Sequence, residues 1–231
     1  MINTENRNGS SYLFLPFVIA FLILLPVYLI AERNMGFKKA TALKLVLSGL
    51  CTICSLTGFL ITGKYVEISR LLLLVAMVFT FIGDYFLQFI RISEKKFNIG
   101  IFSFAMAQIS LIVSLVISYG VHLLDFKLTA VICLLVLILM IVQKWKLGKA
   151  RIPLMIYTLL LAFMVSKAFT VLFLLEKTCF TILLTAGAVL FLASDFLLGI
   201  WNYHSGKRIH ANLNWITYFS AIMLIALSNW F

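Results

Sequence analysis

The chain has 231 residues, of which 63% are hydrophobic and 12% are charged, and its mean hydropathy is +1.11. Soluble domains are usually about 45–50% apolar and about 25% charged, so a soluble domain of this length could not bury so much apolar surface. With only four cysteines and twelve glycines, a disulfide scaffold and a glycine-rich repeat are also excluded. The composition therefore predicts an all-α polytopic membrane protein.

Eight stretches are long and apolar enough for a transmembrane helix, which needs about 20 mostly apolar residues. In chain order they cover residues 12–31, 42–62, 68–90, 98–118, 126–143, 153–174, 178–201 and 212–230. The fifth stretch is the weakest, because Asp125 and Lys127 lie at its start. The connecting loops are too short for a separate domain, so residues 1–231 are expected to form one integral membrane domain.

The net charge of +11 would indicate a nucleic-acid partner in a soluble protein. Here the basic residues lie between apolar stretches, which is typical of cytoplasmic loops, and we expect no nucleic-acid partner. The odd-numbered loops carry 13 Lys and Arg residues, against 5 in the N-terminal segment and the even-numbered loops. This bias places the odd loops in the cytoplasm and both termini outside. The usage of Ile, Lys, Phe and Asn is typical of a low-GC bacterium, so we expect a bacterial plasma membrane.

Aromatic residues near the ends of the spans are typical of the belts that lie at membrane interfaces. They are Tyr12, Trp145, Trp201, Tyr203 and Trp230.

Two of the eight acidic residues, Asp84 and Asp195, lie inside apolar stretches, whereas the other six lie in loops or at span edges. An Asp at the centre of a membrane helix costs roughly 2.5–3.5 kcal/mol on insertion scales, so it normally faces the bundle interior or a wet cavity. Each aspartate precedes the end of its span by six residues, which is about 9 Å at the α-helical rise. The third and seventh spans run in the same direction, so the two carboxylates are predicted to lie at one depth near the cytoplasmic side.

Helical spacing puts Gln88 and Arg91 on the face of Asp84, and Gly199 and Asn202 on the face of Asp195. These polar stripes predict a cavity that is open to the cytoplasm.

Each aspartate could instead pair with a lysine or a hydroxyl and only fix helix packing. Lys44 lies near the right depth for such a pair, whereas Lys167 lies nearer the outside, where its side chain can snorkel.

A shift of 111 residues carries Asp84 onto Asp195 and the start of the second span, residue 42, onto the start of the sixth, residue 153. This shift indicates two parallel four-helix halves. Cys51 and Cys54 lie in an apolar run with no βαβ context, so we interpret them as packing residues.

The three histidines do not indicate a metal site. They are His122, His204 and His210, all in loops, and none is spaced with a carboxylate on a helix as a zinc site requires. Ser194 has no histidine base at its depth and is not a credible nucleophile. We therefore expect no metal and no other cofactor.

The chain resembles the YhhN-like, or lysoplasmalogenase, family over nearly its whole length. The resemblance is carried by Gly83-Asp84-Tyr85-Phe86-Leu87 in the third span and Ser194-Asp195-Phe196-Leu197-Leu198 in the seventh. Further positions that fit the family are Lys44, Phe97, Gly100, Phe104, Tyr157, Met164, Gly187, Tyr218 and Ala221. The chain departs from the family at Gln108, where members often have His, and at Ile222, where they often have Gln.

The resemblance implies an eight-helix hydrolase that cleaves the vinyl ether bond of lysoplasmalogen, or of a related ether lysolipid, within the bilayer lipids. The products would be a fatty aldehyde and a glycerophospho head group. Such cleavage needs a protonated carboxylic acid and a second carboxylate, a division of roles that glycosidases also use. Asp84 and Asp195 would be the catalytic pair, with their individual roles open, and the substrate-binding residues would be Lys44, Gln88, Tyr157, Asn202 and Tyr218.

Two other classes of protein fit the residues. A small-molecule or lipid transporter could use the two membrane aspartates as proton or substrate sites. A structural or assembly protein would use them only for packing.

Overall fold

The structure is a computed structural model that describes residues 12–34, 37–62, 67–89, 93–145, 147–148 and 151–231. The described part of the chain is helical and contains no strand. Its helices are α2 (Leu15–Asn34), α3 (Phe37–Ile61), α4 (Ile68–Leu87), α5 (Glu94–Tyr119), α6 (Leu123–Val142), α7 (Arg151–Thr170), α8 (Cys179–Ile200) and α9 (Arg208–Ser228). All eight are long and apolar enough to cross a membrane, which confirms the predicted fold class.

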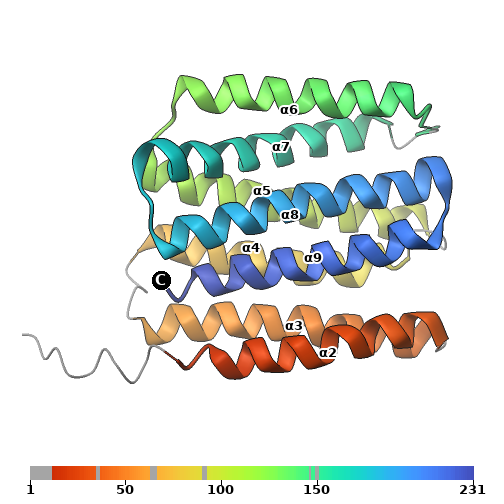
Figure 1. The fold of residues 1–231 in the computed structure, drawn as a ribbon, viewed down its shortest axis with the longest axis horizontal. Coiled ribbons are helices and arrows are strands. Elements are labelled where there is room, and N and C mark those ends of the chain that lie inside the picture. The colour runs from red at the N-terminus through yellow and green to blue at the C-terminus, as the bar shows by residue number, and fades with distance from the viewer. Residues whose placement is uncertain (1–11, 35–36, 63–66, 90–92, 146, 149–150) are drawn as a thin grey trace, which may run out of the picture.

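The helices run along one common axis as a single bundle (Figure 1). α4 packs most extensively on α5, and α8 on α9, and α9 is the most buried of the eight. α2 and α6 lie at opposite sides of the bundle and are the least buried. The ends of α2, α4, α6 and α8 and the starts of α3, α5, α7 and α9 lie at one end, which we call the basic end, and the C-terminus lies at the other.

Five helices, α3, α5, α6, α7 and α9, begin earlier in the chain than the sequence predicts. In α5 and α6 the reason is that polar residues enter the first turn. α5 begins at Glu94 rather than residue 98, and the Ser93 hydroxyl caps it by accepting a hydrogen bond from the Lys96 main-chain nitrogen. α6 begins at Leu123 rather than residue 126, and Asp125 accepts a 2.9 Å hydrogen bond from the His122 main-chain nitrogen.

The last turns of two spans are π-helical. The segment η4 (Val171–Leu175) follows α7, and η5 (Trp201–Ser205) follows α8. A π-turn carries more residues per turn than an α-turn, so it changes the directions of the side chains that follow it. The seventh span therefore extends to Ser205, beyond the predicted end at residue 201.

The interpretation of Trp230 as an interface residue is wrong. Trp230 is buried, and its indole nitrogen donates a 3.0 Å hydrogen bond to the main-chain oxygen of Cys54. Cys51 and Cys54 are themselves buried free thiols within the core.

The expectation that Lys167 snorkels is also wrong. Its side chain is fully buried, and Nζ lies 3.3 Å from Oδ2 of Asp125, which is fully buried too. The ammonium also lies 3.4 Å from Nδ1 of His122. Asp125 therefore lies at a span edge, as expected, in the first turn of α6, but it is part of a buried ion pair that joins α6 to α7.

Candidate active site

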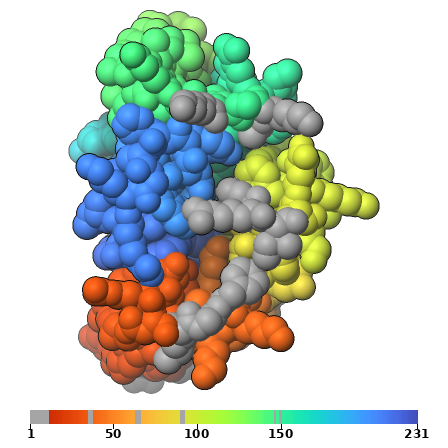
Figure 2. Space-filling view, turned by 90° about the vertical axis from the view of Figure 1, so that its right-hand side faces the viewer, coloured from red at the N-terminus to blue at the C-terminus, as the bar shows by residue number. Residues whose placement is uncertain are grey.

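A cavity of about 490 Å³ lies at the basic end of the bundle. This volume is in the range of small-molecule sites, about 300–1,000 Å³. Each of the eight helices contributes to its wall. All seven residues singled out from the sequence line it: Lys44, Asp84, Gln88, Tyr157, Asp195, Asn202 and Tyr218. Figure 2 shows this end, where α8 and α9 (blue) lie between α6 (green) and the α2–α3 pair (orange).

Asp84 is held by residues from two other helices. Its side chain is 1% exposed, and Oδ1 lies 3.0 Å from Nζ of Lys44, near the start of α3. Oδ2 accepts a 2.7 Å hydrogen bond from the hydroxyl of Tyr218 on α9. The Lys44 ammonium also donates to the main-chain oxygen of Asp84, at 3.4 Å. Asp84 therefore has a cation and a hydroxyl donor as fixed partners.

The packing of Phe104 explains why the residue before Asp84 is the glycine Gly83. A Cβ built at position 83 would lie 2.6 Å from the Phe104 ring, so only glycine lets Phe104 pack directly on α4. The Phe104 ring meets the Tyr218 ring edge-to-face, with centroids 6.1 Å apart. The Gly-Asp motif thus provides both the carboxylate and the space for the ring beside its hydroxyl partner.

Asp195 has a hydroxyl partner but, in the part of the chain that the structure describes, no cation within ion-pair distance. The Tyr157 hydroxyl on α7 donates a 2.5 Å hydrogen bond to Oδ2, and the Ser194 hydroxyl donates a longer one, 3.4 Å, to Oδ1. Asp195 is only half-buried, because its side chain faces the cavity. The side-chain amide of Asn214 on α9 donates a 2.7 Å hydrogen bond to the main-chain oxygen of Ser194. This bond positions Asn214, which also lines the cavity.

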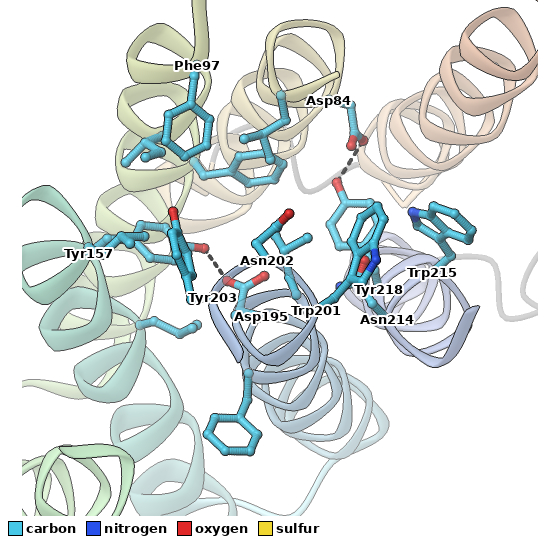
Figure 3. A pocket seen from close by; sticks show the side chains of 18 of the residues that line it. Asp84, Phe97, Tyr157, Asp195, Trp201, Asn202, Tyr203, Asn214, Trp215 and Tyr218 are labelled. Atoms are coloured by element: carbon cyan, nitrogen blue, oxygen red, sulfur yellow. Dashed lines mark hydrogen bonds between the residues drawn. The ribbon is translucent and has the colours of Figure 1, made fainter. Parts of the chain in front are cut away.

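The two carboxylates share one cavity and have similar partners. Each accepts a hydrogen bond from a tyrosine on a neighbouring helix (Figure 3). The Tyr218 phenol, which donates a hydrogen bond to Asp84, lines the same cavity wall as Asp195. As the sequence predicted, the two carboxylate side chains face one cavity. The main difference between their surroundings is the Lys44 ammonium beside Asp84.

Gln88 and Asn202 complete the polar wall that we predicted. Gln88 is the C-cap residue of α4, and its Oε1 is buried with no hydrogen-bond partner among the described residues, so it can accept a hydrogen bond from a ligand. Asn202 reaches the wall from η5. Arg91, which shares their predicted stripe, lies outside the described residues.

Several wall residues were missed or interpreted differently in the sequence. Trp145, Trp201 and Tyr203 were interpreted as interface aromatics, but they line the cavity. Their positions near span ends are typical of both locations, so nothing in the sequence separated the two. Glu32 was treated as a loop charge; it lines the cavity near its mouth and pairs with Arg208 at 2.9 Å.

The two departures from the family pattern occupy different environments. Gln108 is fully buried on α5 within reach of the Tyr157 hydroxyl, and its amide has no hydrogen-bond partner among the described residues. Ile222 is buried in the apolar core of α9. Gln108 is thus placed to influence the partner of Asp195, whereas Ile222 is a packing residue.

The fold and the cavity define an integral membrane protein with two aspartates in one pocket inside its helical bundle. The chain belongs to the YhhN family, whose model matches residues 33–229, most of its length. This match confirms the resemblance that the two motifs indicate. No curated protein and no solved structure matches the chain. Among the described residues, no group of three or more His, Cys, Asp or Glu side chains could hold a metal ion.

Proposed function

We propose that this protein is a hydrolase that cleaves the vinyl ether bond of lysoplasmalogen, or of a related ether lysolipid. The proposal rests mainly on one observation: Asp84 and Asp195 line the same cavity, and only Asp84 has a cationic partner among the described residues. Membership of the YhhN family supports it. The products are a fatty aldehyde and a glycerophospho head group.

The difference between the carboxylates supports separate roles. The Lys44 ammonium balances the charge of an ionised Asp84, so this carboxylate serves as the permanent negative charge of the site. Asp195 has no such cation, faces the cavity, and has its Oδ1 held only by the long contact from Ser194. A nearby cation favours the ionised form of a carboxylic acid, and Asp195 lacks one among the described residues, so Asp195 is the proposed acid.

The reaction then runs as follows. Asp195 gives its proton to the vinyl carbon that is β to the ether oxygen, which produces an oxocarbenium ion. Asp84 stabilises this cation electrostatically. Water adds to the cationic carbon and returns a proton to Asp195. The hemiacetal collapses when its hydroxyl proton passes to the glycerol oxygen, which releases the aldehyde and leaves both carboxylates as they began.

The remaining polar wall suits the rest of the substrate. Lys44, Gln88 and Asn202 lie on the polar wall and can contact the glycerophosphate, while Tyr157 and Tyr218 hold the two carboxylates in place. We place the basic end in the cytoplasm of a bacterial plasma membrane, because its loops carry most of the Lys and Arg residues.

The direct test is aldehyde release by purified protein from a vinyl ether lysolipid, with the matching acyl ester lysolipid as the control. Aldehyde from the first and no fatty acid from the second is the expected result. Uptake of the lysolipid into liposomes without hydrolysis would instead support the transporter.

A further inference from the structure

One arm of the cavity wall, which we call the apolar arm, carries no charged side chain. It consists of Val136 and Met140 of α6, Leu154 and Leu161 of α7, and Leu192 of α8. Asp84, Lys44 and Asn202 lie on other parts of the same wall, whereas Asp195 and its partner Tyr157 border the arm as helical neighbours of Leu192 and of Leu154 and Leu161. The cavity is therefore divided into polar and apolar parts, as an amphiphilic ligand requires.

The apolar arm is shallow toward the centre of the bundle. Leu161 is the deepest residue of α7 on the wall, and it lies about one helical turn beyond Tyr157, the partner of Asp195. The next residues inward, Met164 and Val165, are fully buried in the core. A long hydrocarbon chain therefore cannot extend inward from the carboxylates.

The side of the cavity between α6 and α8 is where a hydrocarbon chain can pass from the cavity to the lipid. In the described part of the chain, α6 packs on α7 and makes no extensive contact with any other helix. Even so, Val136 and Met140 of α6 share the cavity wall with Leu192 and Phe196 of α8. The two helices thus border the cavity without packing on each other, and the outer face of α6 is exposed toward lipid.

Trp145 bounds this side at the basic end. Its ring stacks on Phe196, with centroids 5.5 Å apart, and on Tyr203, at 6.3 Å. The indole also lies directly on Gly199, where a Cβ would collide with the ring. Glycine at position 199 therefore makes room for a large apolar ring that joins the end of α6 to α8, above the apolar arm.

We infer that the hydrocarbon chain of the substrate lies in the apolar arm and leaves the cavity sideways into the bilayer, between α6 and α8 and beneath Trp145. This inference rests on the proposed function, since it takes a single-chain ether lipid as the ligand. The head group lies in the polar part of the cavity and the scissile bond beside the carboxylates. The chain stays largely in lipid, so binding avoids moving its methylene groups into water.

A bulky residue in the exit tests this route against its neighbour on the same helix. Val136→Trp narrows the exit, whereas Leu135→Trp is the matched control, since Leu135 is exposed and does not line the cavity. We expect Val136→Trp to lower kcat/KM for a long-chain vinyl ether lysolipid by at least about tenfold and to spare a short-chain analogue. Leu135→Trp should change neither. An equal loss on both chain lengths, or no loss on either, would overturn the route.

A labelling experiment separates this inference from the proposed function. A lysolipid with a photoreactive diazirine at its chain end is irradiated with the Asp195→Asn variant, which is expected to bind without turnover. Adducts on α6 or on the facing part of α8, reduced by Val136→Trp, support the route even if the wild type hydrolyses no ether lipid. Adducts confined to α2, α3 or α9 exclude the route, even if hydrolysis is confirmed.

Discussion

Nζ of Lys44 lies 3.0 Å from Oδ1 of Asp84 and 3.4 Å from the main-chain oxygen of the same residue. One lysine thus binds both the side chain and the backbone of the aspartate, near the end of α4. This double contact makes Lys44 part of the carboxylate site, and it is the lysine–aspartate pair that the depth of Lys44 in the sequence suggested, in addition to the expected substrate-binding role. It also gives the two aspartates different electrostatic surroundings.

Asp84→Asn and Asp195→Asn should each lower the rate of aldehyde release by about 10²–10⁴-fold or more, because asparagine can neither donate the acid proton nor carry the counter-charge. Both variants should remain folded, since an uncharged side chain costs less in a membrane helix. The Lys44 ammonium that Asp84→Asn leaves unpaired is partly exposed, unlike the Asp84 carboxylate. The assay is aldehyde release at saturating lysolipid, with Glu94→Gln, a carboxylate of the α5 first turn away from the cavity, as the control. Wild-type rates in both Asn variants would make the aspartates structural.

Tyr157→Phe and Tyr218→Phe each remove a single hydroxyl that donates to a carboxylate. Asp84 is charged throughout the proposed reaction, and Asp195 becomes charged as it gives up its proton. A hydrogen bond to a charged group contributes about 1.5–3 kcal/mol, so each change should lower kcat by roughly 10- to 100-fold. Tyr85→Phe is the matched control, because Tyr85 follows Asp84 directly and is exposed. If the three variants had equal kcat values, the tyrosines would not position the carboxylates during turnover.

Lys44→Met should impair both stability and turnover, because it leaves the Asp84 carboxylate buried without its cation. Removal of one partner of a buried pair can cost up to about 3–5 kcal/mol. The double variant Lys44→Met/Asp84→Asn should recover thermal stability in detergent but not aldehyde release. A Lys44→Met protein with wild-type stability, wild-type kcat and a raised KM would instead indicate that Lys44 only binds substrate.

The buried pair of Asp125 and Lys167 should matter for stability and not for turnover, since neither residue lines the cavity. Lys167→Met alone should lower the midpoint of thermal unfolding, and Lys167→Met/Asp125→Asn should restore most of it, because the unpaired charge is gone. Specific activity of the folded fraction should match the wild type in both. Lost turnover in the folded double variant would assign the pair a functional role.

Cys179 offers a native probe of topology. It is an exposed thiol at the start of α8, at the end of the bundle opposite the basic end. In intact cells a membrane-impermeant maleimide should label the wild type but not Cys179→Ser. A Cys179→Ser/Lys207→Cys protein, with its new thiol at the basic end, should be labelled only after permeabilisation. The reverse pattern would place the basic end outside.

The sequence predicted the number of spans and the principal polar residues of the cavity well, because long apolar runs and charges within them are strong signals. It predicted the helix starts less well. Glu94 and Asp125 were placed in loops or at span edges on the basis of charge. Both lie in the first turn of a helix, and the ion pair with Lys167 buries Asp125. The partner of a buried charge depends on which helices pack together, and one sequence does not contain that information.

The aromatic part of the cavity wall was also beyond sequence reasoning. Trp145 lies at a span end, where an indole is equally suited to the membrane interface and to a cavity wall. Only the packing of Trp145 on Gly199 distinguishes the two locations. The π-helical segment that carries Asn202 left no recognisable pattern either, and the proposed duplication into two halves stays a prediction.

The position of the cavity at one end of the bundle ties each molecule to a single monolayer of the membrane. Its wall residues all come from the half of each helix nearest the basic end, and the other half is closed by core packing. In sealed vesicles that contain the protein in both orientations, lysolipid added from outside enters the outer monolayer only. Molecules whose basic end faces outward would consume it, while those of the opposite orientation would stay idle until the lipid crosses to the inner monolayer.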